Sequence, residues 1–505
     1  MKKYLFFTFT IIFIFAITGC KNENNLQSNN TTLIIAQGGK PKSLDPYTFN
    51  EIPALFITQH IYSTLFTKDE NEKIIGDLAE TWDFSDPLKL KITLKDNIYF
   101  HSGEKLTSED VLFSFNRMKE KPASKIMVED IKDIEIIDYK TFNILLKAPS
   151  APIFHSLSHP LTAILNKTHT LKFKDEISIY PMGTGPFLFK NFGEGDKIEL
   201  EAFNKYYKGK SKIQNLIFKV ISEPSSRVAA LETGEIDIAV GISPIDTQTI
   251  EKNKNLLLIS KPTTSTEYIF VNTEKKYLND KNFRKIISMS LDREGIINAI
   301  YLGTGNIPNS IFNPNVFGYN SKLEFFKQDI DGAKNLMNNY FKNEHINIKI
   351  WTNDSAPRIQ IAQILQANLK EININATIEI LEWGTYLQQS ALGEHDLLLG
   401  GWVSGTGDGD IVLYPLIHSM SKGGAGNRAF YENKYIDNLI EMGRKELNIE
   451  NRIKIYENIQ EKLNEDLPLI PVLYKNENIG INKKVKNFIF SSNIMHNLYN
   501  ISKED

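Results

Sequence analysis

A glycine-rich loop that carries two carboxylates is the segment of this chain best suited to chemistry by residue type and spacing. It runs Gly405-Thr406-Gly407-Asp408-Gly409-Asp410. A phosphate-binding loop would need a different glycine spacing and a following Lys-Ser or Lys-Thr pair, and neither is present. A calcium loop would need oxygen ligands where three apolar residues, 411–413, follow. The loop therefore holds two carboxylates without a nucleotide or calcium motif.

The rest of the chain shows no arranged catalytic set. Its sequence lacks a Gly-x-Ser-x-Gly elbow, a His-Glu-x-x-His pair and a Walker loop. Its histidines are scattered along the chain, and the one nearest the glycine-rich loop, His418, is interpreted as a partly buried polar residue after an apolar segment. We therefore predict no enzyme, with no catalytic residues, no bound metal and no cofactor.

The single cysteine, Cys20, closes an N-terminal export signal. Two lysines at the start are followed by a nearly unbroken apolar run over 5–17 and then by small residues. The ending Ile17-Thr18-Gly19-Cys20 resembles a bacterial lipobox, which implies cleavage before Cys20 and a diacylglycerol on its sulfur. One acyl chain binds a membrane only marginally, whereas two or more anchor a protein stably. An uncleaved signal anchor with an incidental cysteine is the alternative.

Composition describes the body behind this anchor. We expect a signal peptide over 1–19, then the lipidated Cys20 and a polar, disordered tether over 20–31. The body beyond it contains no cysteine, so its core must hold without disulfides, and 41% of the chain is hydrophobic. A length of 505 residues favours two or three domains. A net charge of −3 offers no basic face for nucleic acid, and the body has no apolar stretch long enough to span a bilayer.

Strands and a helix lead up to the glycine-rich loop and must position it. Apolar residues alternate over 346–350, recur at helical spacing over 361–369, and alternate again over 374–380. This β-α-β order predicts a parallel pair of strands with a right-handed crossover. A further buried strand is expected over 395–402, directly before the loop.

Two other segments carry clear local patterns. Thr107, with Asp110 three residues on, has the spacing of a helix capping box. The apolar segment 467–474 is interrupted by prolines, which remove ladder donors. We expect this segment at a sheet edge or in a connection between lobes.

Seven segments follow one another in a recognisable order and spacing. They are Ser43-Leu44-Asp45-Pro46, Leu78-Ala79-Glu80-Thr81-Trp82, Ile98 to Val111, Gly183-Thr184-Gly185-Pro186-Phe187, Arg227 to Asp237, Glu382-Trp383-Gly384-Thr385-Tyr386 and Gly401-Trp402. Together they resemble the family 5 extracellular solute-binding proteins of bacterial ABC importers, a group with dipeptide, oligopeptide, glutathione, nickel and haem binders. The resemblance extends from about Leu33 to the C-terminus.

The resemblance implies an α/β fold, a two-lobed periplasmic-binding-protein clamshell (type II-like) with mixed β-sheets flanked by helices. The core domain of lobe 1 would comprise 32–55, 180–272 and 476–505, an extra domain would be inserted at 56–179, and lobe 2 would span 273–475. The ligand would lie between the lobes, and hinge closure would bury it. Four of the matching residues are interpreted as core: Phe100, Trp82, Val111 and Leu231.

The resemblance also implies where ligand contacts lie. One segment follows the opening Asp-Pro, where the backbone of peptide-binding relatives pairs with the peptide as an added strand. The other is the loop after Trp402, with Trp383 nearby. The expected ligand-binding residues are Asn50, Glu51, Ile52, Trp383, Trp402, Val403, Ser404, Gly405, Thr406, Asp408, Asp410, Asn427 and Arg428.

This chain departs from the peptide-binding pattern at two positions. Many peptide binders have an aspartate three residues after the Trp, where it pairs with the α-ammonium, and this chain has Gly405 there. Some have an arginine three residues before the Trp, and this chain has Leu399. Asp408 or Asp410 is the expected substitute for the ammonium contact.

Arg428 leaves two interpretations open. Its guanidinium offers a bidentate donor for a ligand carboxylate. Equally, it clamps the loop or bridges the lobes, since arginines serve both purposes. We expect Arg428→Ala and Asp408→Ala to weaken binding while the ligand-free melting temperature changes little.

These observations predict an extracytoplasmic substrate-binding lipoprotein of an ABC importer. It would capture a small peptide-like ligand, a di- or oligopeptide or glutathione, and deliver it to the permease. We expect a monomer held by the lipid on Cys20 outside the cytoplasmic membrane, in the periplasm or at the cell surface. A nickel-chelate or haem binder of the same family is the nearer alternative. An exported hydrolase and a surface receptor are alternatives from other classes.

Overall fold

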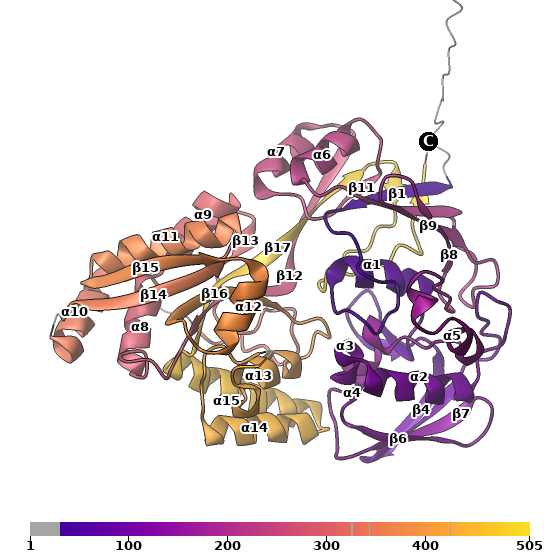
Figure 1. Cartoon of the computed structure of the whole chain (residues 1–505), viewed down its shortest axis with the longest axis horizontal. Helices are drawn as coiled ribbons and strands as arrows, with labels where there is room; N and C mark the ends of the chain where they lie inside the picture. The colour runs from indigo at the N-terminus through magenta and orange to yellow at the C-terminus, as the bar shows by residue number, and fades with distance from the viewer. Residues whose placement is uncertain (1–30, 325–326, 343, 425, 505) are drawn as a thin grey trace, which may run out of the picture.

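Two lobes joined by two long strands make up the molecule (Figure 1). The computed structural model describes residues 31–324, 327–342, 344–424 and 426–504, so the predicted signal peptide, Cys20 and the tether up to residue 30 lie outside the described residues. β12 (Leu256–Val271) and β17 (Leu469–Asn482) pair antiparallel and pass from one lobe into the other. The predicted two-lobed α/β fold is confirmed.

One mixed sheet continues through both lobes, in the order β15-β14-β16-β12-β17-β11-β1-β10-β9-β8. Its remaining strands are β1 (Thr32–Gln37), β8 (Phe187–Gly193), β9 (Lys197–Ala202), β10 (Asn215–Val220), β11 (Ile238–Ala239), β14 (Ile346–Asn353), β15 (Ile374–Leu381) and β16 (Leu397–Val403), with β13 (Gly305–Asn306) paired to β17. Lobe 1 holds β1 to β11 and the segment after β17, and lobe 2 holds the elements between β12 and β17.

Lobe 2 covers both faces of its part of the sheet with helices. The helices are α8 (Lys281–Ser290), α9 (Arg293–Tyr301), α10 (Ile330–Phe341) and α11 (Ala356–Lys370) on one face, and α12 (Trp383–Ala391), α13 (Asp410–Ile417), η4 (Ser419–Ser421), α14 (Lys434–Lys445) and α15 (Ile449–Asp466) on the other. Ile269 and Val271 of β12 pack in the first core, whereas Tyr268 and Phe270 pack in the second. This alternation follows from the two-residue period of a strand.

The predicted β-α-β unit is confirmed in lobe 2. β14 and β15 pair in parallel, and α11 connects them. β16 lies beside β14 in parallel and beside β12 in antiparallel, and it confirms the strand expected before the glycine-rich loop. The loop therefore begins where β16 reaches the junction with lobe 1.

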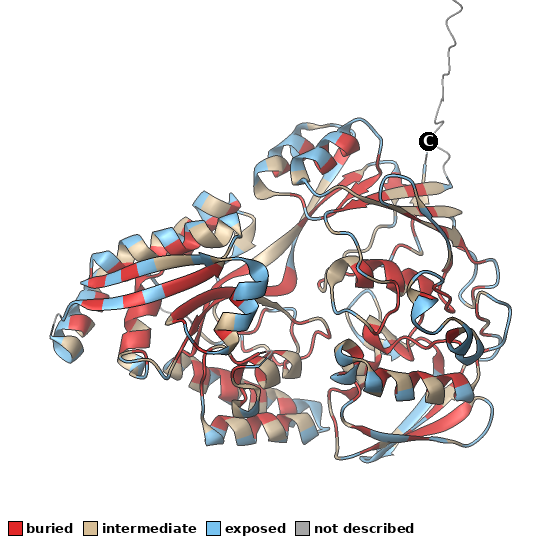
Figure 2. Cartoon of the chain, in the orientation of Figure 1, coloured by how far each residue is buried: buried red, intermediate tan, exposed pale blue. Residues whose placement is uncertain are grey.

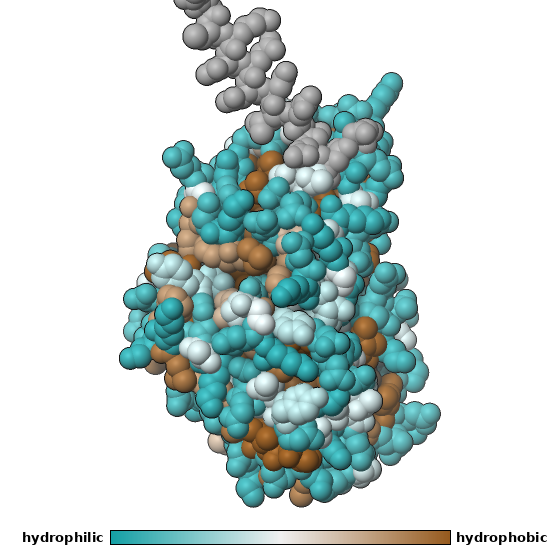
Figure 3. Space-filling model, turned by 90° about the vertical axis from the view of Figure 1, so that its right-hand side faces the viewer, coloured by the Kyte–Doolittle hydropathy of each residue, from teal (hydrophilic) through white to brown (hydrophobic). Residues whose placement is uncertain are grey.

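Lobe 1 adds a separate antiparallel sheet in the order β4-β5-β7-β6. Its further elements are α1 (Ile52–Ile61), β2 (Phe66–Lys68), β3 (Ile74–Gly76), β4 (Ala79–Asp86), β5 (Lys89–Leu94), α2 (Ser108–Glu120), α3 (Pro122–Lys125), β6 (Ile131–Ile136), β7 (Thr141–Leu146), α4 (Ile153–Leu157), η1 (Pro160–Thr162), α5 (Lys167–Phe173), η2 (Lys174–Ser178), α6 (Pro224–Glu232), η3 (Pro244–Asp246), α7 (Thr247–Lys252), β18 (Val485–Lys486) and β19 (Ser502–Lys503). The face of lobe 1 turned away from lobe 2 is largely hydrophilic (Figure 3), which suits contact with water. No helix in the described part of the chain is long and apolar enough to cross a membrane.

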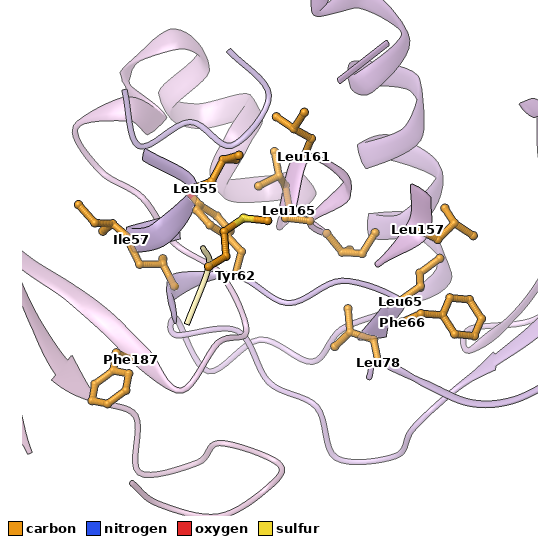
Figure 4. Packing of buried hydrophobic residues seen from close by; sticks show 14 of the residues in the cluster. Leu55, Ile57, Tyr62, Leu65, Phe66, Leu78, Leu157, Leu161, Leu165 and Phe187 are labelled. Atoms are coloured by element: carbon orange, nitrogen blue, oxygen red, sulfur yellow. The ribbon is translucent and has the colours of Figure 1, made fainter. Parts of the chain in front are cut away.

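Buried residues concentrate in the strands and on the inner faces of the helices (Figure 2). The core of lobe 1 includes Leu55 and Tyr62 of the α1 region, Phe66 of β2 and Phe187 of β8 (Figure 4). Gly183 and Gly185 allow the chain to cross this core closely. A Cβ on Gly183 would lie 2.3 Å from the Ile61 carbonyl oxygen, so no larger residue fits.

Local predictions in lobe 1 have mixed outcomes. The capping box is confirmed, because the Thr107 N–H donates to the Asp110 carboxylate at 3.0 Å at the start of α2. Phe100, Val111 and Leu231 are buried as predicted. Trp82 is 43% exposed, so its assignment to the core is wrong. It lies on the largely exposed strand β4 and packs edge-on against Phe66 at 5.1 Å.

The proline-interrupted segment 467–474 forms the first half of β17. β17 lies inside the sheet between β12 and β11, so the edge-strand alternative is wrong and the connection between lobes is correct. Pro471 pairs with Tyr268 at a shift in register, where a missing ladder donor costs little.

Candidate ligand-binding site between the lobes

The glycine-rich loop is held by hydrogen bonds to β12 and within itself. The Ser404 N–H donates to the Thr264 carbonyl at 3.2 Å, and the Gly407 N–H donates to the Ser404 carbonyl at 3.1 Å. The Ser404 hydroxyl donates to the Asp408 carbonyl at 3.1 Å. The Trp402 indole N–H donates to the Ile411 carbonyl at 2.9 Å, which ties β16 to the start of α13. The loop is therefore a fixed structure at the junction of the lobes.

Asp408 is occupied by a partner in its own lobe. Arg452 of α15 donates to both of its carboxylate oxygens, at 2.7 and 2.8 Å. The aspartate side chain is 1% exposed and that of the arginine is 4% exposed. Burial opposes the charge of Asp408, but Arg452 outweighs it and lowers the pKa of the carboxyl. This carboxylate anchors the loop to α15.

Asp410 is the freer of the two carboxylates. Its side chain is 13% exposed, and Oδ1 lies 3.4 Å from Nε of Arg444. It lines a small cavity of about 40 Å³ between the lobes. Burial raises its pKa to about 7, with Asp408 and Asp130 acting in the same direction and Arg444 against it.

This pKa gives Asp410→Asn a pH-dependent effect on stability. The folded chain keeps the Asp410 proton up to about pH 7, whereas the unfolded chain releases it near pH 4. The free energy of unfolding therefore falls as the pH rises from 4 to 7 and stays lower above 7. Asn cannot ionise, so Asp410→Asn should raise the melting temperature at pH 8 more than at pH 5.

Thermal melts at both pH values check this result. Asp331→Asn is the matched control, because that side chain is 94% exposed. An equal shift for Asp410→Asn at the two pH values would contradict the assignment.

Three side chains of lobe 1 face the glycine-rich loop. Nδ1 of His155 on α4 lies 3.4 Å from Oδ2 of Asp408. Nε2 of His159 lies 3.0 Å from the position that a Cβ on Gly405 would take. Nζ of Lys68 lies 2.5 Å from the corresponding position on Gly407. The absence of side chains at these glycines lets lobe 1 approach the loop closely.

Lys68 also lines a polar cavity of about 280 Å³ in lobe 1. The cavity wall includes Ser158, Phe490 and Ser491. Glu72 on this wall accepts hydrogen bonds from Lys68 Nζ at 3.0 Å and from the backbone and side chain of Ser492, both at 3.2 Å. A cavity of this size beside an interlobe loop is a candidate ligand site.

Sequence reasoning missed these lobe 1 residues. His155 and His159 stand four residues apart, and this spacing was the available indication that both belong to one site. In the described part of the chain no three His, Cys, Asp or Glu side chains form a group that could hold a metal. The His155 ring lies against the Phe317 ring, with centroids 6.2 Å apart, and His159 accepts a hydrogen bond from the Leu161 N–H.

Three of the expected ligand contacts lie in lobe 1, at or just before the start of α1. Asn50 is exposed, and Glu51 and Ile52 are partly buried at the start of α1. The Glu51 carboxylate accepts from the Lys42 N–H at 2.7 Å. Trp383 is 50% exposed at the start of α12 and stacks on Tyr386, with ring centroids 5.4 Å apart. The ligand roles of these residues stay predictions.

Asn427 and Arg428 lie away from the glycine-rich loop. The Asn427 amide donates to the carbonyl of Ile417, which ends α13, whereas Asp410 begins that helix, about 10 Å away by helical rise. Arg428 donates to the Leu387 carbonyl at 3.3 Å. This contact is the one expected if Arg428 clamps a loop onto α12.

Two lobes, a sheet shared between them and a polar loop at their junction define a two-lobed extracellular binding protein. The family model for bacterial extracellular solute-binding proteins, family 5 (middle part), matches residues 73–424. The chain belongs to this family. The family consists of binding proteins, so the prediction that this chain is not an enzyme is confirmed.

Individual relatives match along nearly the whole chain. The dipeptide-binding protein of Escherichia coli (strain K12) is 25% identical over 94% of this chain and 95% of its own. The glutathione-binding protein GsiB of the same organism is 24% identical over 87% of this chain and 88% of its own. The structure of the periplasmic binding protein DppA from Helicobacter pylori, in complex with the peptide STSA, has a TM-score of 0.81 and 27% identity, covering 95% of this chain and 100% of that one.

Proposed function

We propose that this chain is the substrate-binding lipoprotein of an ABC importer and that it captures a small peptide-like ligand between its lobes. The family match over residues 73–424 carries this proposal. The contact of lobe 1 with the glycine-rich loop, beside a polar cavity, supports a ligand site at this junction. The ligand is a di- or oligopeptide or glutathione, as for the relatives from E. coli and H. pylori.

The proposal also includes where the protein lies in the cell and how the chain divides into domains. The lipid on Cys20 and the tether over 20–31 hold the chain outside the cytoplasmic membrane, next to the permease that receives the ligand. Within the chain, the core domain of lobe 1 comprises 32–55, 180–272 and 476–505, the inserted domain 56–179, and lobe 2 273–475. Expression of Cys20→Ala should release the protein from the membrane fraction, and retention would contradict the anchor.

Ligand-dependent stabilisation tests the function. A ligand that binds only the folded state at a hundred times its Kd adds about 2.7 kcal/mol to the free energy of unfolding. Di- to pentapeptides and glutathione should therefore raise the melting temperature of the purified protein. A shift from Ni²⁺-histidine or haem alone would replace the peptide ligand by a chelate. Cleavage products of these peptides, detected by mass spectrometry, would contradict a binding role.

A further inference from the structure

His159 brings an N–H donor of lobe 1 to the glycine-rich loop. It caps η1, where its Nδ1 accepts a hydrogen bond from the Leu161 N–H at 3.2 Å. Because Nδ1 is the acceptor, the ring proton lies on Nε2. Burial, with a smaller contribution from Lys68, lowers the pKa of His159 to about 4, so the ring is neutral at pH 7 and Nε2 remains a donor.

Nε2 lies at the loop, and no described residue accepts a hydrogen bond from it. Nε2 lies 3.0 Å from the Cβ position of Gly405, which has no side chain to accept a hydrogen bond. The ring is 3% exposed, and among the described residues its hydrogen bond is the one from Leu161. An N–H donor at the loop without a protein partner is available to a ligand that supplies an acceptor.

Lys68 adds a second donor group beside the same loop. Its Nζ lies against Gly407 and makes one ion pair, with Glu72 at 3.0 Å. An ammonium has three N–H groups, so this pair leaves donors for a ligand. Lys68 lines the cavity of about 280 Å³ together with Ser158 and Pro160, the two neighbours of His159 in the chain.

Three of the carboxylates near these donors already have partners. Asp408 accepts from Arg452, and Glu72 accepts from Lys68 and Ser492. Asp69, also on the cavity wall, accepts from the backbone N–H groups of Asn71 and Lys73 in its own turn. Gly405 and Gly407 face the side-chain nitrogen atoms of His159 and Lys68, so a ligand ammonium placed beside them would meet donors.

We propose that His159 and Lys68 form a subsite for a hydrogen-bond acceptor, so that the ligand presents a carboxylate or acyl carbonyl beside Gly405 and carries no free α-ammonium there. This inference rests on the proposed peptide-binding function and names its ligand class: peptide-like molecules whose amino end is blocked or acylated.

Matched ligands test the subsite by isothermal titration calorimetry. The probes are Ala-Leu and Ala-Ala-Leu, each with a free amine, an N-acetyl group (a neutral carbonyl) or an N-succinyl group (a carboxylate). The purified protein should bind at least one blocked form roughly tenfold more tightly than the free amine. Gaining or losing one hydrogen bond to a charged group changes an affinity by roughly this factor. Tighter binding of the succinyl form would identify a carboxylate, and equal binding a carbonyl.

Variants locate the effect. His159→Asn keeps an acceptor for the Leu161 N–H but is too short to reach Gly405, so the preference should disappear. Gly405→Asp places a carboxylate opposite His159 and should reverse the preference, and Lys68→Met should weaken the succinyl form most. His169→Asn is the control, because that ring donates to the Tyr180 carbonyl away from the loop.

Two results would overturn the inference while leaving the proposed function intact. One is tighter binding of the free amines by the unmodified protein. The other is an unchanged preference in both His159→Asn and Gly405→Asp. Failure of all the peptides to bind would count against the proposed function itself and would remove the inference with it.

Discussion

Replacing Asp408 by asparagine is expected to lower the free energy of unfolding by about 3–5 kcal/mol, the cost of breaking a buried ion pair from one side. Arg452 would keep its charge at 4% exposure and lose the carboxylate that accepts two of its hydrogen bonds. Its remaining bonds, to the Gly443 carbonyl and the Tyr456 hydroxyl, do not neutralise that charge. Urea unfolding followed by circular dichroism measures the loss.

Two further variants separate the ion pair from the loop. Asp410→Asn, two residues on, removes a carboxylate whose pKa is about 7 and should not destabilise the chain at pH 7. Asp408→Asn combined with Arg452→Met leaves no unpaired charge, so the double variant should be more stable than Asp408→Asn alone. An unchanged free energy of unfolding in Asp408→Asn would show that the pair does not form.

The destabilisation predicted for Asp408→Asn contradicts the expectation from the sequence that Asp408→Ala leaves the ligand-free melting temperature nearly unchanged. The expectation rested on the sequence around Asp408, where glycines flank a carboxylate that looks free to meet a ligand. Its partner Arg452 lies 44 residues away on α15. A charge pattern within one loop does not contain that pairing, because the approach of α15 depends on the packing of lobe 2.

Local elements were predictable because their causes are local. The alternation of apolar residues over 346–350 and 374–380 is the period of a half-buried strand, and the structure has β14 and β15 there. The capping box of Thr107 and Asp110 needs only three residues of chain. The order of family segments gave the two-lobed fold, which no single pattern in the chain establishes.

Contacts between lobes were the part that the sequence did not predict. His155, His159 and Lys68 come from segments far from the loop that they face, and the glycines that admit them look like flexible linkers in the sequence. Trp82 shows the same limit on a smaller scale. It was interpreted as core because it matches the family pattern, but β4 exposes most of its side chains, and the choice of face depends on the neighbouring sheet.

Removing the charge of Arg444 is expected to weaken ligand binding roughly ten- to hundredfold, equivalent to about 1.5–3 kcal/mol. Arg444 of α14 joins the lobes at the edge of the cleft. Its guanidinium lies 3.2 Å from Glu129 and 3.5 Å from Asp130, both in lobe 1, and 3.4 Å from Asp410 in lobe 2. Without it, Glu129 and Asp130 of lobe 1 lose their positively charged partner in lobe 2.

The effect should act through closure and not through the fold of either lobe. The Arg444 carbonyl still accepts from the Ala151 N–H at 2.7 Å, and Met in its place would keep the packing against Tyr414. A ligand that binds the closed form loses affinity when that form becomes less populated. Arg444→Met should therefore raise the Kd, while the free energy of unfolding of the ligand-free protein changes much less.

Calorimetry and small-angle X-ray scattering together test this mechanism. The ligand-free variant should have a larger radius of gyration than the unmodified protein, and saturating ligand should reduce the difference. Lys462→Met is the matched control, because Lys462 pairs with Glu465 and Asp466 within its own helix and should change neither quantity. Glu129→Gln should raise the Kd in the unmodified protein but not further in Arg444→Met, since the pair is then already absent. A Kd within twofold of the unmodified protein would show that closure does not depend on this arginine.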